Sequence, residues 1–495
     1  MPEQPTDIVR ESFLEWLATE DADRQARYAV YRDYYDGEHD TQLTARQRAY
    51  LQIKMGEEFN SNYCPLVVDA LAERLRVTGF DCGEDEALAE QLWEWWLASR
   101  GDALQRVAHT SAVRDGDTYV LGDWDEEEAR PRFRHQAAYD GVEGVKIHYD
   151  QETREIAYAS KRWRAESDAP GQAGTVRRMN LYYPDRIEKY VSNQDIFEGA
   201  WVQFTADGEA WPVPWVNAAG EPLGVPVVHL RNNDQGYDYG QSELKNAVPL
   251  QNALNKALID LMAIADLQGF PVPYMLGDDP SGLSLAPGSW VYSKHPPTGD
   301  ESVAVGQLSA ADLGSVVAYK DSIVTEIARV SRTPLSYFQT SGQRPAEGTL
   351  KQEEVGLVAR AEDRQVGFGN AWEDCMRLAV RLHNTFGDGG LDEEATISTL
   401  WDDPQTRNEK EHLEALVLKS QLSVPAETLW AEMGYDVDQI ADMKAQRDEE
   451  MEQQSNVGGE LLRQFEGGGF GGTQQGQQRG GNREASRTEQ GQERV

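Results

Sequence analysis

The strongest constraint on the fold is a leucine-rich stretch between Ser242 and Phe270. Its apolar residues recur every three or four positions, which is the spacing of one face of an α-helix. They are Leu250, Leu254, Leu258, Leu261 and Ile264. Pro271 and Pro273 end the pattern, because a proline disfavours helical backbone at the residue before it. The stretch therefore predicts one helix over 242–270, roughly 40 Å long.

Two further long helices are predicted after this one. The second runs from about 310 to 332 and ends before Pro334, and the third runs from 349 to about 385. Residues 271–313, between the first two helices, contain glycine, proline and short strand-like pieces such as 289–292. Residues 335–348 are predicted to form a polar loop that precedes the third helix.

The N-terminal half mixes helical and strand-like patterns. Helical spacing is found at 21–35, 62–76 and 87–100. We interpret Trp93 and Trp96, in the last of these, as core packing. Strand-like runs follow at 118–121, 145–149, 156–163, 179–183, 186–191 and 225–230. The region is therefore predicted to be an α+β unit with an antiparallel sheet.

The chain is strongly acidic, with 85 Asp and Glu against 47 Lys and Arg and a formal net charge of −38. Such a surface repels phosphate, which argues against a conventional DNA-binding protein and is compatible with a surface past which DNA slides. Three separated cysteines, Cys64, Cys82 and Cys375, favour reduced thiols in a cytosolic environment. We expect no signal peptide and no membrane span, because no apolar run is long enough.

A search for chemical motifs yields one weak candidate. Phosphate-binding, dinucleotide-binding, nucleophile-elbow and HExxH motifs are absent from the sequence. The acidic run Asp123–Glu128 could hold a divalent cation, and it supports the alternative of a metal-dependent hydrolase. It lacks the glycine that an EF-hand turn requires, so we interpret it as a solvated turn. We therefore predict no catalytic residue, no cofactor and no metal.

The C-terminal part has two compositions. Residues 388–452 indicate a smaller, acidic helical unit, which leaves open an adaptor or scaffolding protein that binds partners through acidic helices. Residues 453–495 are rich in Gly, Gln, Arg and Glu and contain almost no apolar side chains. Such a segment cannot bury a core, so a disordered tail is predicted.

Several segments, in order along the chain, resemble one protein family. They are YYDGEHD (34–40), NYCPLVVDALAERLRVTGF (62–80), YGQSEL (239–244), TPLSYF (333–338), LKQEE (350–354) and WDDP (401–404). This order and spacing resembles the portal proteins of tailed double-stranded DNA phages, particularly siphophages, over roughly residues 8–450. The sequence departs from the family at 345–348, which read PAEG where many relatives have a Ser-Gly-Glu-Ala-like sequence.

The resemblance implies an architecture for the whole chain. It implies a wing (1–238 and 349–387), a stem of two helices (239–270 and 314–334), a small α/β clip (271–313), a tunnel loop (335–348) and a helical crown (388–452). It also implies closed rings of about twelve subunits, because a repeated heterologous contact can close. The ring would lie in the virion, at a capsid vertex, after assembly in the host cytoplasm.

The resemblance also implies partners and contact residues. The partners are double-stranded DNA in the channel, the terminase large subunit, a head-completion adaptor protein, and the major capsid and scaffolding proteins. Candidates for facing DNA in the tunnel loop are Gln339, Thr340, Ser341, Gln343 and Arg344. Basic candidates on the stem are Lys245, Lys256, Lys320, Arg329 and Arg332. The alternative for the stem residues is that they form ion pairs between subunits or face solvent.

Overall fold

The structure is a computed structural model, and it divides into two compact units, Met1–His412 and Leu413–Val495. The predicted tail 453–495 and most of the segment 271–313 lie outside the described residues. The structure describes residues 13, 22–40, 43–54, 59–150, 152–166, 175–192, 201–205, 208–268, 273–276, 291–293, 304–307, 313–338, 347–405, 416–422, 424–435 and 439–447.

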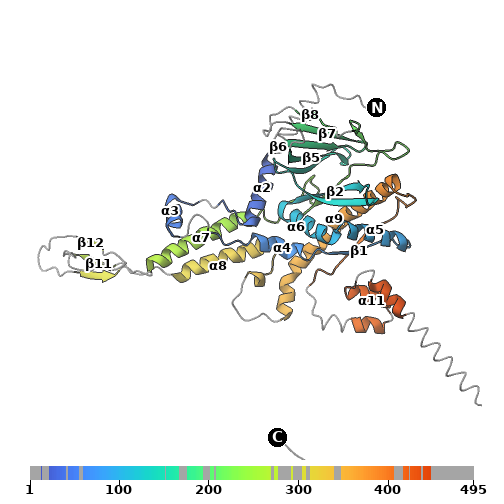
Figure 1. Ribbon diagram of the computed structural model, residues 1–495. Helices are drawn as coiled ribbons and strands as arrows, with labels where there is room; N and C mark the ends of the chain where they lie inside the picture. Colours follow the sequence, from blue (N-terminus) through green and yellow to red (C-terminus); the bar gives the residue numbers. More distant parts are fainter. Residues whose placement is uncertain are drawn as a thin grey trace, which may run out of the picture. The chain divides into compact units, whose positions relative to one another are not determined.

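Two long helices, α7 (Ala247–Gln268) and α8 (Leu313–Val330), lie side by side in the first unit (Figure 1). Both confirm predicted helices, but α7 begins at Ala247 rather than near Ser242. The reason is local: the Ser242 hydroxyl accepts a hydrogen bond from the Leu244 N–H at 2.9 Å, and turns fill the segment before the helix. The two helices bury Leu254, Ile259, Ile323 and Ile327.

A small sheet is inserted in the chain between α7 and α8. Its strands are β11 (Pro273–Leu276), β12 (Val291–Ser293) and β13 (Ala304–Gln307), in the order β12-β11-β13. Strand β11 pairs in parallel with β12 and antiparallel with β13. The expected strand-like piece near 289–292 is present as β12.

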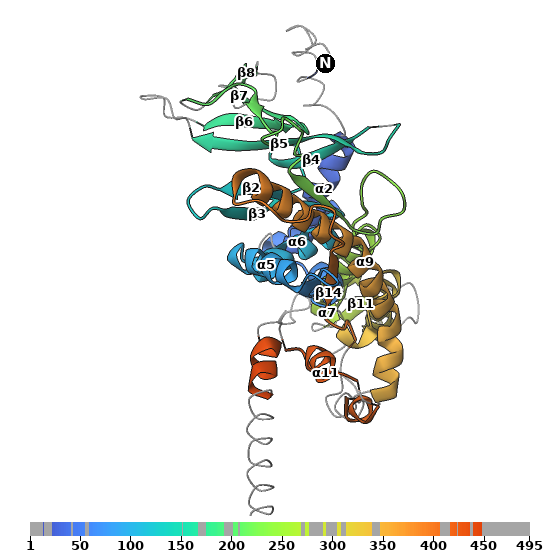
Figure 2. The same cartoon turned by 90° about the vertical axis from the view of Figure 1, so that its right-hand side faces the viewer.

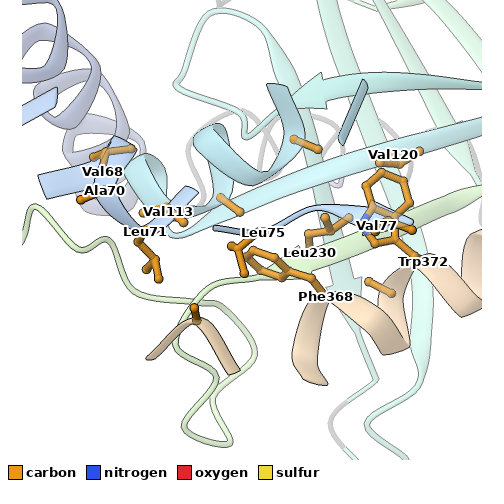
Figure 3. Close-up of a cluster of buried hydrophobic side chains, with 14 of the residues drawn as sticks. Val68, Ala70, Leu71, Leu75, Val77, Val113, Val120, Leu230, Phe368 and Trp372 are labelled. Atoms are coloured by element: carbon orange, nitrogen blue, oxygen red, sulfur yellow. The ribbon is translucent and has the colours of Figure 1, made fainter. Parts of the chain in front are cut away.

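A third long helix, α9 (Glu347–Phe386), forms much of the core, as its spacing predicted. It follows α8 and a short 3₁₀ helix, η1 (Leu335–Tyr337). Phe368 and Trp372 of α9 pack in one cluster with Val120 and Leu230 of a sheet and Val113 of α6 (Gly101–Asp115), as Figure 3 shows. Burial of this apolar surface is the main stabilising term of the first unit.

The sheet beneath α9 has three antiparallel strands in the order β10-β2-β3. They are β2 (Asp117–Asp125), β3 (Arg130–Ala137) and β10 (Val227–Arg231). Side chains alternate between the two faces of a strand. Val120 and Leu230 therefore face the helices, whereas Tyr119 and Leu121 contribute to a second core on the other face.

A second antiparallel sheet packs on that other face, so sheet lies on sheet with helices beyond (Figure 2). Its order is β4-β5-β6-β7-β8, and β9 also pairs with β7. The strands are β4 (Gly144–Tyr149), β5 (Ile156–Glu166), β6 (Thr175–Tyr182), β7 (Arg186–Ser192), β8 (Val202–Gln203) and β9 (Val213–Pro214). The predicted antiparallel arrangement is confirmed, but the strands divide between two sheets.

The predicted helices of the N-terminal half are present as α2 (Ala22–Asp36), α4 (Cys64–Ala72) and α5 (Glu86–Ala98). Helices α3 (Ala45–Lys54) and α6 and strand β3 were not predicted. Helix α6 buries the polar residues Gln105, His109 and Ser111, so its inner face does not look apolar in the sequence. Strand β3 places arginines between its few buried side chains.

Residues expected in the C-terminal helical unit belong partly to the first unit. Strand β14 (Ser398–Trp401) pairs antiparallel with β1 (Val77–Asp81). These residues are therefore strand rather than helix, because their hydrogen-bonding partner is more than three hundred positions earlier in the chain. The second unit has helical residues at 416–421, in α11 (Ala426–Glu432) and at 439–447.

A buried histidine connects α6 to α9. The His109 side chain is 0% exposed, and its Nε2 accepts a hydrogen bond from Trp372 Nε1 at 2.9 Å. Its Nδ1 lies 3.0 Å from the Leu75 carbonyl oxygen, so the Nδ1–H tautomer satisfies both contacts. Burial lowers the pKa of His109 to about 4. The neutral ring is therefore part of the core.

We expect this histidine to make the first unit sensitive to acid. The pKa of His109 lies near 4 in the folded chain and near 6.5 without the protein environment. Between these pH values the unfolded chain binds more protons, so the free energy of unfolding falls as the pH is lowered through this window, by up to about 3 kcal/mol. Urea unfolding of wild type and His109→Gln at several pH values tests this. The variant should be less stable at pH 7 but have a shallower pH dependence; an unchanged slope would contradict the expectation.

Candidate functional site

The first feature of the candidate site is a buried charged cluster where α7, α8 and α9 meet. Glu243, just before α7, forms an ion pair with Arg360 Nη2 at 2.7 Å and accepts a hydrogen bond from Arg364 Nη2 at 2.9 Å. Arg364 Nε also donates to Asn232 Oδ1 at 2.6 Å, and Arg360 donates to the carbonyl of Ser331 at the end of α8. We call these four side chains, Glu243, Arg360, Arg364 and Asn232, the Glu243 cluster.

The Glu243 cluster places one carboxylate beside two buried guanidinium groups. Arg360 and Arg364 are 8% and 6% exposed, one helical turn apart on α9. Burial lowers the pKa of Arg360, and Glu243 opposes that shift. A single, largely buried carboxylate thus pairs with two buried guanidinium groups, and removing it would leave only the exposed Asp363 beside Arg364. The cluster therefore fixes the start of α7 and the end of α8 to the same turn of α9.

A second junction is centred on Arg74, after α4. Its guanidinium donates to the Tyr337 hydroxyl of η1 at 2.7 Å and to Glu354 of α9 at 3.2 Å. It also donates to the carbonyl of Pro404, in the chain that leaves β14. An open pocket of about 390 Å³ is lined by Arg74, Tyr337 and Pro404 and by three carboxylates, Glu73, Asp402 and Asp403. Arg74 therefore holds both sides of the loop between α8 and α9.

A third network positions the chain just before α7. Asp117, at the start of β2, is 1% exposed and accepts from Tyr28, His229 and the Gly240 N–H at 2.6, 2.8 and 2.7 Å. Burial opposes ionisation, but these hydrogen bonds and the charge of His229 hold the pKa of Asp117 below its ordinary value. The Tyr149 hydroxyl contacts the other nitrogen of His229 at 2.7 Å. Asp117 thus fixes the backbone at Gly240.

These clusters were not found by reading the sequence. Arg360 and Arg364 lie on the same side of α9 as Leu357, Ala361 and Phe368, all of which are buried. Charged residues on the apolar side of a helix indicate a buried ion pair, and that signal was present in the sequence. The identity of the partner was not, because Glu243 is more than one hundred positions away.

Of the five basic stem candidates, three lie on α7 or α8, whereas Lys245 precedes α7 and Arg332 follows α8. Lys320 contacts Asp321 at 2.9 Å, and Arg329 contacts Glu326 at 2.6 Å. Lys245 donates to Gln241 Oε1 at 3.3 Å. Lys256 and Arg332 are exposed, and neither forms an ion pair with a residue that the structure describes. Two of the five thus form ion pairs within the subunit, and Lys245 bonds to a neutral amide.

The other candidates divide between described and masked parts of the chain. Gln339, Thr340, Ser341, Gln343 and Arg344 lie outside the described residues. In the acidic run, Asp125 Oδ1 accepts from the N–H groups of Glu127 and Glu128 at 3.1 and 3.3 Å. Arg130 pairs with Glu128, and Arg132 lies 3.4 Å from Asp125. These carboxylates therefore stabilise the turn in which they lie.

No helix in the described part of the chain is long and apolar enough to cross a membrane. Across the same residues, no group of three or more His, Cys, Asp or Glu side chains is arranged to hold a metal ion.

Comparison with known proteins gives the context for these junctions. Residues 14–454 match the family described as phage portal protein, SPP1 Gp6-like. The portal protein of Mycobacterium phage D29 is 28% identical over 403 residues, covering 78% of this chain and 79% of that protein. The portal protein of Mycobacterium phage L5 is 27% identical over 478 residues, covering 90% of this chain and 88% of that protein.

A solved structure is also similar to this chain. It is the neck of an empty GTA particle computed with C6 symmetry, with a TM-score of 0.40 and 13% identity. The match covers 76% of this chain and 89% of that one. The family match, by contrast, includes all three helices α7, α8 and α9 and the clusters that join them. The chain belongs to the SPP1 Gp6-like family of phage portal proteins.

Proposed function

We propose that this chain is one subunit of a ring at a single vertex of the phage capsid, through which DNA enters and leaves. The observation that carries this proposal is the pair α7 and α8, joined by a small sheet and fixed to α9 by the Glu243 cluster. Paired helices of this kind can stand around an axis, and rigid attachment to a core lets each subunit present them alike. Membership of the portal family supports the same role.

Within this proposal the parts of the chain have separate roles. Helices α7 and α8 form the stem, and β11, β12 and β13 belong to the clip, which would contact the terminase and later the head-completion adaptor. Residues 335–348 form the tunnel loop, and 388–452 belong to the crown. Residues 1–238 and 349–387 form the wing, next to the capsid and scaffolding proteins. No catalysis is required of any of them.

The net charge of −38 fits passage of DNA better than tight binding of DNA. Phosphates are repelled by an acidic surface, so they find no strong site at which translocation would stop. Isolated basic side chains could still guide the backbone. Lys256 and Arg332 are the stem candidates without an ion pair among the described residues, so we assign this role to them first.

The experiment that tests the proposal is native mass spectrometry of the purified chain, combined with negative-stain images. We expect one closed species of about twelve subunits with a central hole. A chain that remains monomeric or dimeric across the accessible concentration range, and also when mixed with capsid and scaffolding proteins, would instead favour an acidic adaptor. Packaging assays with Lys256→Glu and Lys320→Glu then separate a guiding side chain from one that is already paired.

A further inference from the structure

The outer side of α9 carries an apolar stripe that the first unit leaves exposed. Val355 and Val366 are 63% and 68% exposed, and Ala359 between them is also exposed. At about 100° per residue, these three positions fall within about 40° of one another around the helix. Glu362 and Asp363 lie on either side of the stripe, and both are exposed. We call Val355, Ala359 and Val366, with Glu362 and Asp363, the α9 stripe.

The chain's own core cannot cover this stripe. The opposite side of α9 carries Leu357, Ala361, Phe368 and Trp372, each 0% exposed, and packs on α4 and the three-stranded sheet. Valine loses side-chain conformational entropy in a helix. Two largely exposed valines therefore add no stability to α9 unless another surface buries them. The stripe therefore indicates a contact with another molecule.

A surface of complementary character lies on α5 and α6. Leu97 and Val107 are 46% and 50% exposed, and Arg100 and Arg106 are exposed beside them in the sequence. We call these four residues the α5–α6 surface. Figure 2 shows α5 and the N-terminal half of α9 on opposite sides of the first unit. One side thus offers valines next to carboxylates, and the other offers apolar side chains next to arginines.

We propose that the α9 stripe of one subunit docks on the α5–α6 surface of a second copy of this chain. Val355 and Val366 would cover Leu97 and Val107, and Glu362 would face Arg106. Two different surfaces on opposite sides of one unit form a heterologous contact, which repeats around an axis until the ring closes. The inference rests on the proposed ring, and it adds the residues that would join neighbouring subunits.

Charge exchange tests this pairing. Glu362→Arg should raise the concentration needed for half-maximal ring formation about tenfold, because it places two positive charges opposite each other. Arg106→Glu should have a similar effect, and the combination Glu362→Arg with Arg106→Glu should return assembly to near the wild-type concentration. Asp363 stays unchanged because it pairs with Arg364. Loss of assembly in the double variant as large as the sum of the single losses would overturn the pairing.

A substitution within the apolar part of the α9 stripe has a matched control elsewhere in the chain. Val366→Asp should abolish rings while leaving the subunit folded, as far-ultraviolet circular dichroism would check. Val202 on β8 is 60% exposed and outside both surfaces, so Val202→Asp should assemble normally. Equal assembly of Val366→Asp and wild type would exclude the stripe from the contact.

Cysteine cross-linking separates failure of the pairing from failure of the ring. Subunits carrying Val366→Cys and Val107→Cys should form disulfide-linked multimers on mild oxidation. The native thiols interfere little: Cys64, Cys82 and Cys375 are buried, and burial raises the pKa of Cys82 to about 11. Rings that form without cross-links would overturn the pairing and leave the proposed function intact. Wild-type chain that forms no ring under any condition would overturn both.

Discussion

Glu243→Gln should lower the free energy of unfolding of the first unit by about 3 to 5 kcal/mol, because the substitution removes the largely buried carboxylate that pairs with two buried guanidinium groups. Glutamine keeps the shape of the side chain and one acceptor oxygen. The loss of stability therefore measures the effect of the missing charge rather than of altered packing. Arg360 and Arg364 are too buried for water to replace the carboxylate. Urea unfolding followed by tryptophan fluorescence measures the change.

The matched control for Glu243→Gln uses the same arginine. Asp363 also contacts Arg364, through Nη1, but its side chain is 72% exposed. Asp363→Asn should therefore change stability by less than about 1 kcal/mol, as is usual for exposed ion pairs. Equal effects of the two substitutions would mean that the Glu243 cluster is solvated and does not fix the helices. In that case the rigid attachment of α7 and α8 to α9 would need another explanation.

Trp372→Ala is expected to have an effect of similar size, about 3 to 5 kcal/mol, from the cavity left by a large buried side chain. Trp372 is 0% exposed and packs edge to face on Trp96, with ring centroids 4.8 Å apart. The substitution also removes the hydrogen bond that His109 Nε2 accepts. Helix α9 contacts α4 and all three strands of the β10-β2-β3 sheet. Removing the Trp372 side chain should therefore destabilise the whole first unit.

Two further variants separate the contributions of packing and of the hydrogen bond to the effect of Trp372→Ala. Trp372→Phe keeps most of the ring volume but not the donor to His109, so we expect a smaller loss of about 1 to 3 kcal/mol. Trp430→Ala lies in the second unit and should leave unfolding of the first unit unchanged. A Trp372→Phe variant as unstable as Trp372→Ala would show that the hydrogen bond, rather than the packing, dominates at this position.

The long helices could be predicted from the sequence because their signal is local. Leu254 and Leu258, or Phe368 and Trp372, recur at the period of a helix, and prolines mark the ends. Turns with an acidic residue at the first position, such as Asp150–Thr153, are equally local, and here Asp150 accepts from the Thr153 N–H at 2.9 Å. Seven of the strands were placed by the same reasoning, and the order of motifs identified the family.

Only the tertiary structure decided which distant groups meet. Helix α6 has no clear apolar side in the sequence, because it buries Gln105 and His109, whose partners are Val77 and Leu75. Strand β14 forms where it does because β1 offers it hydrogen bonds. The Glu243 cluster needs three helices together before two arginines share one carboxylate. Periodicity is a property of neighbouring residues, whereas neutralising a buried charge depends on which remote side chain the fold brings to it.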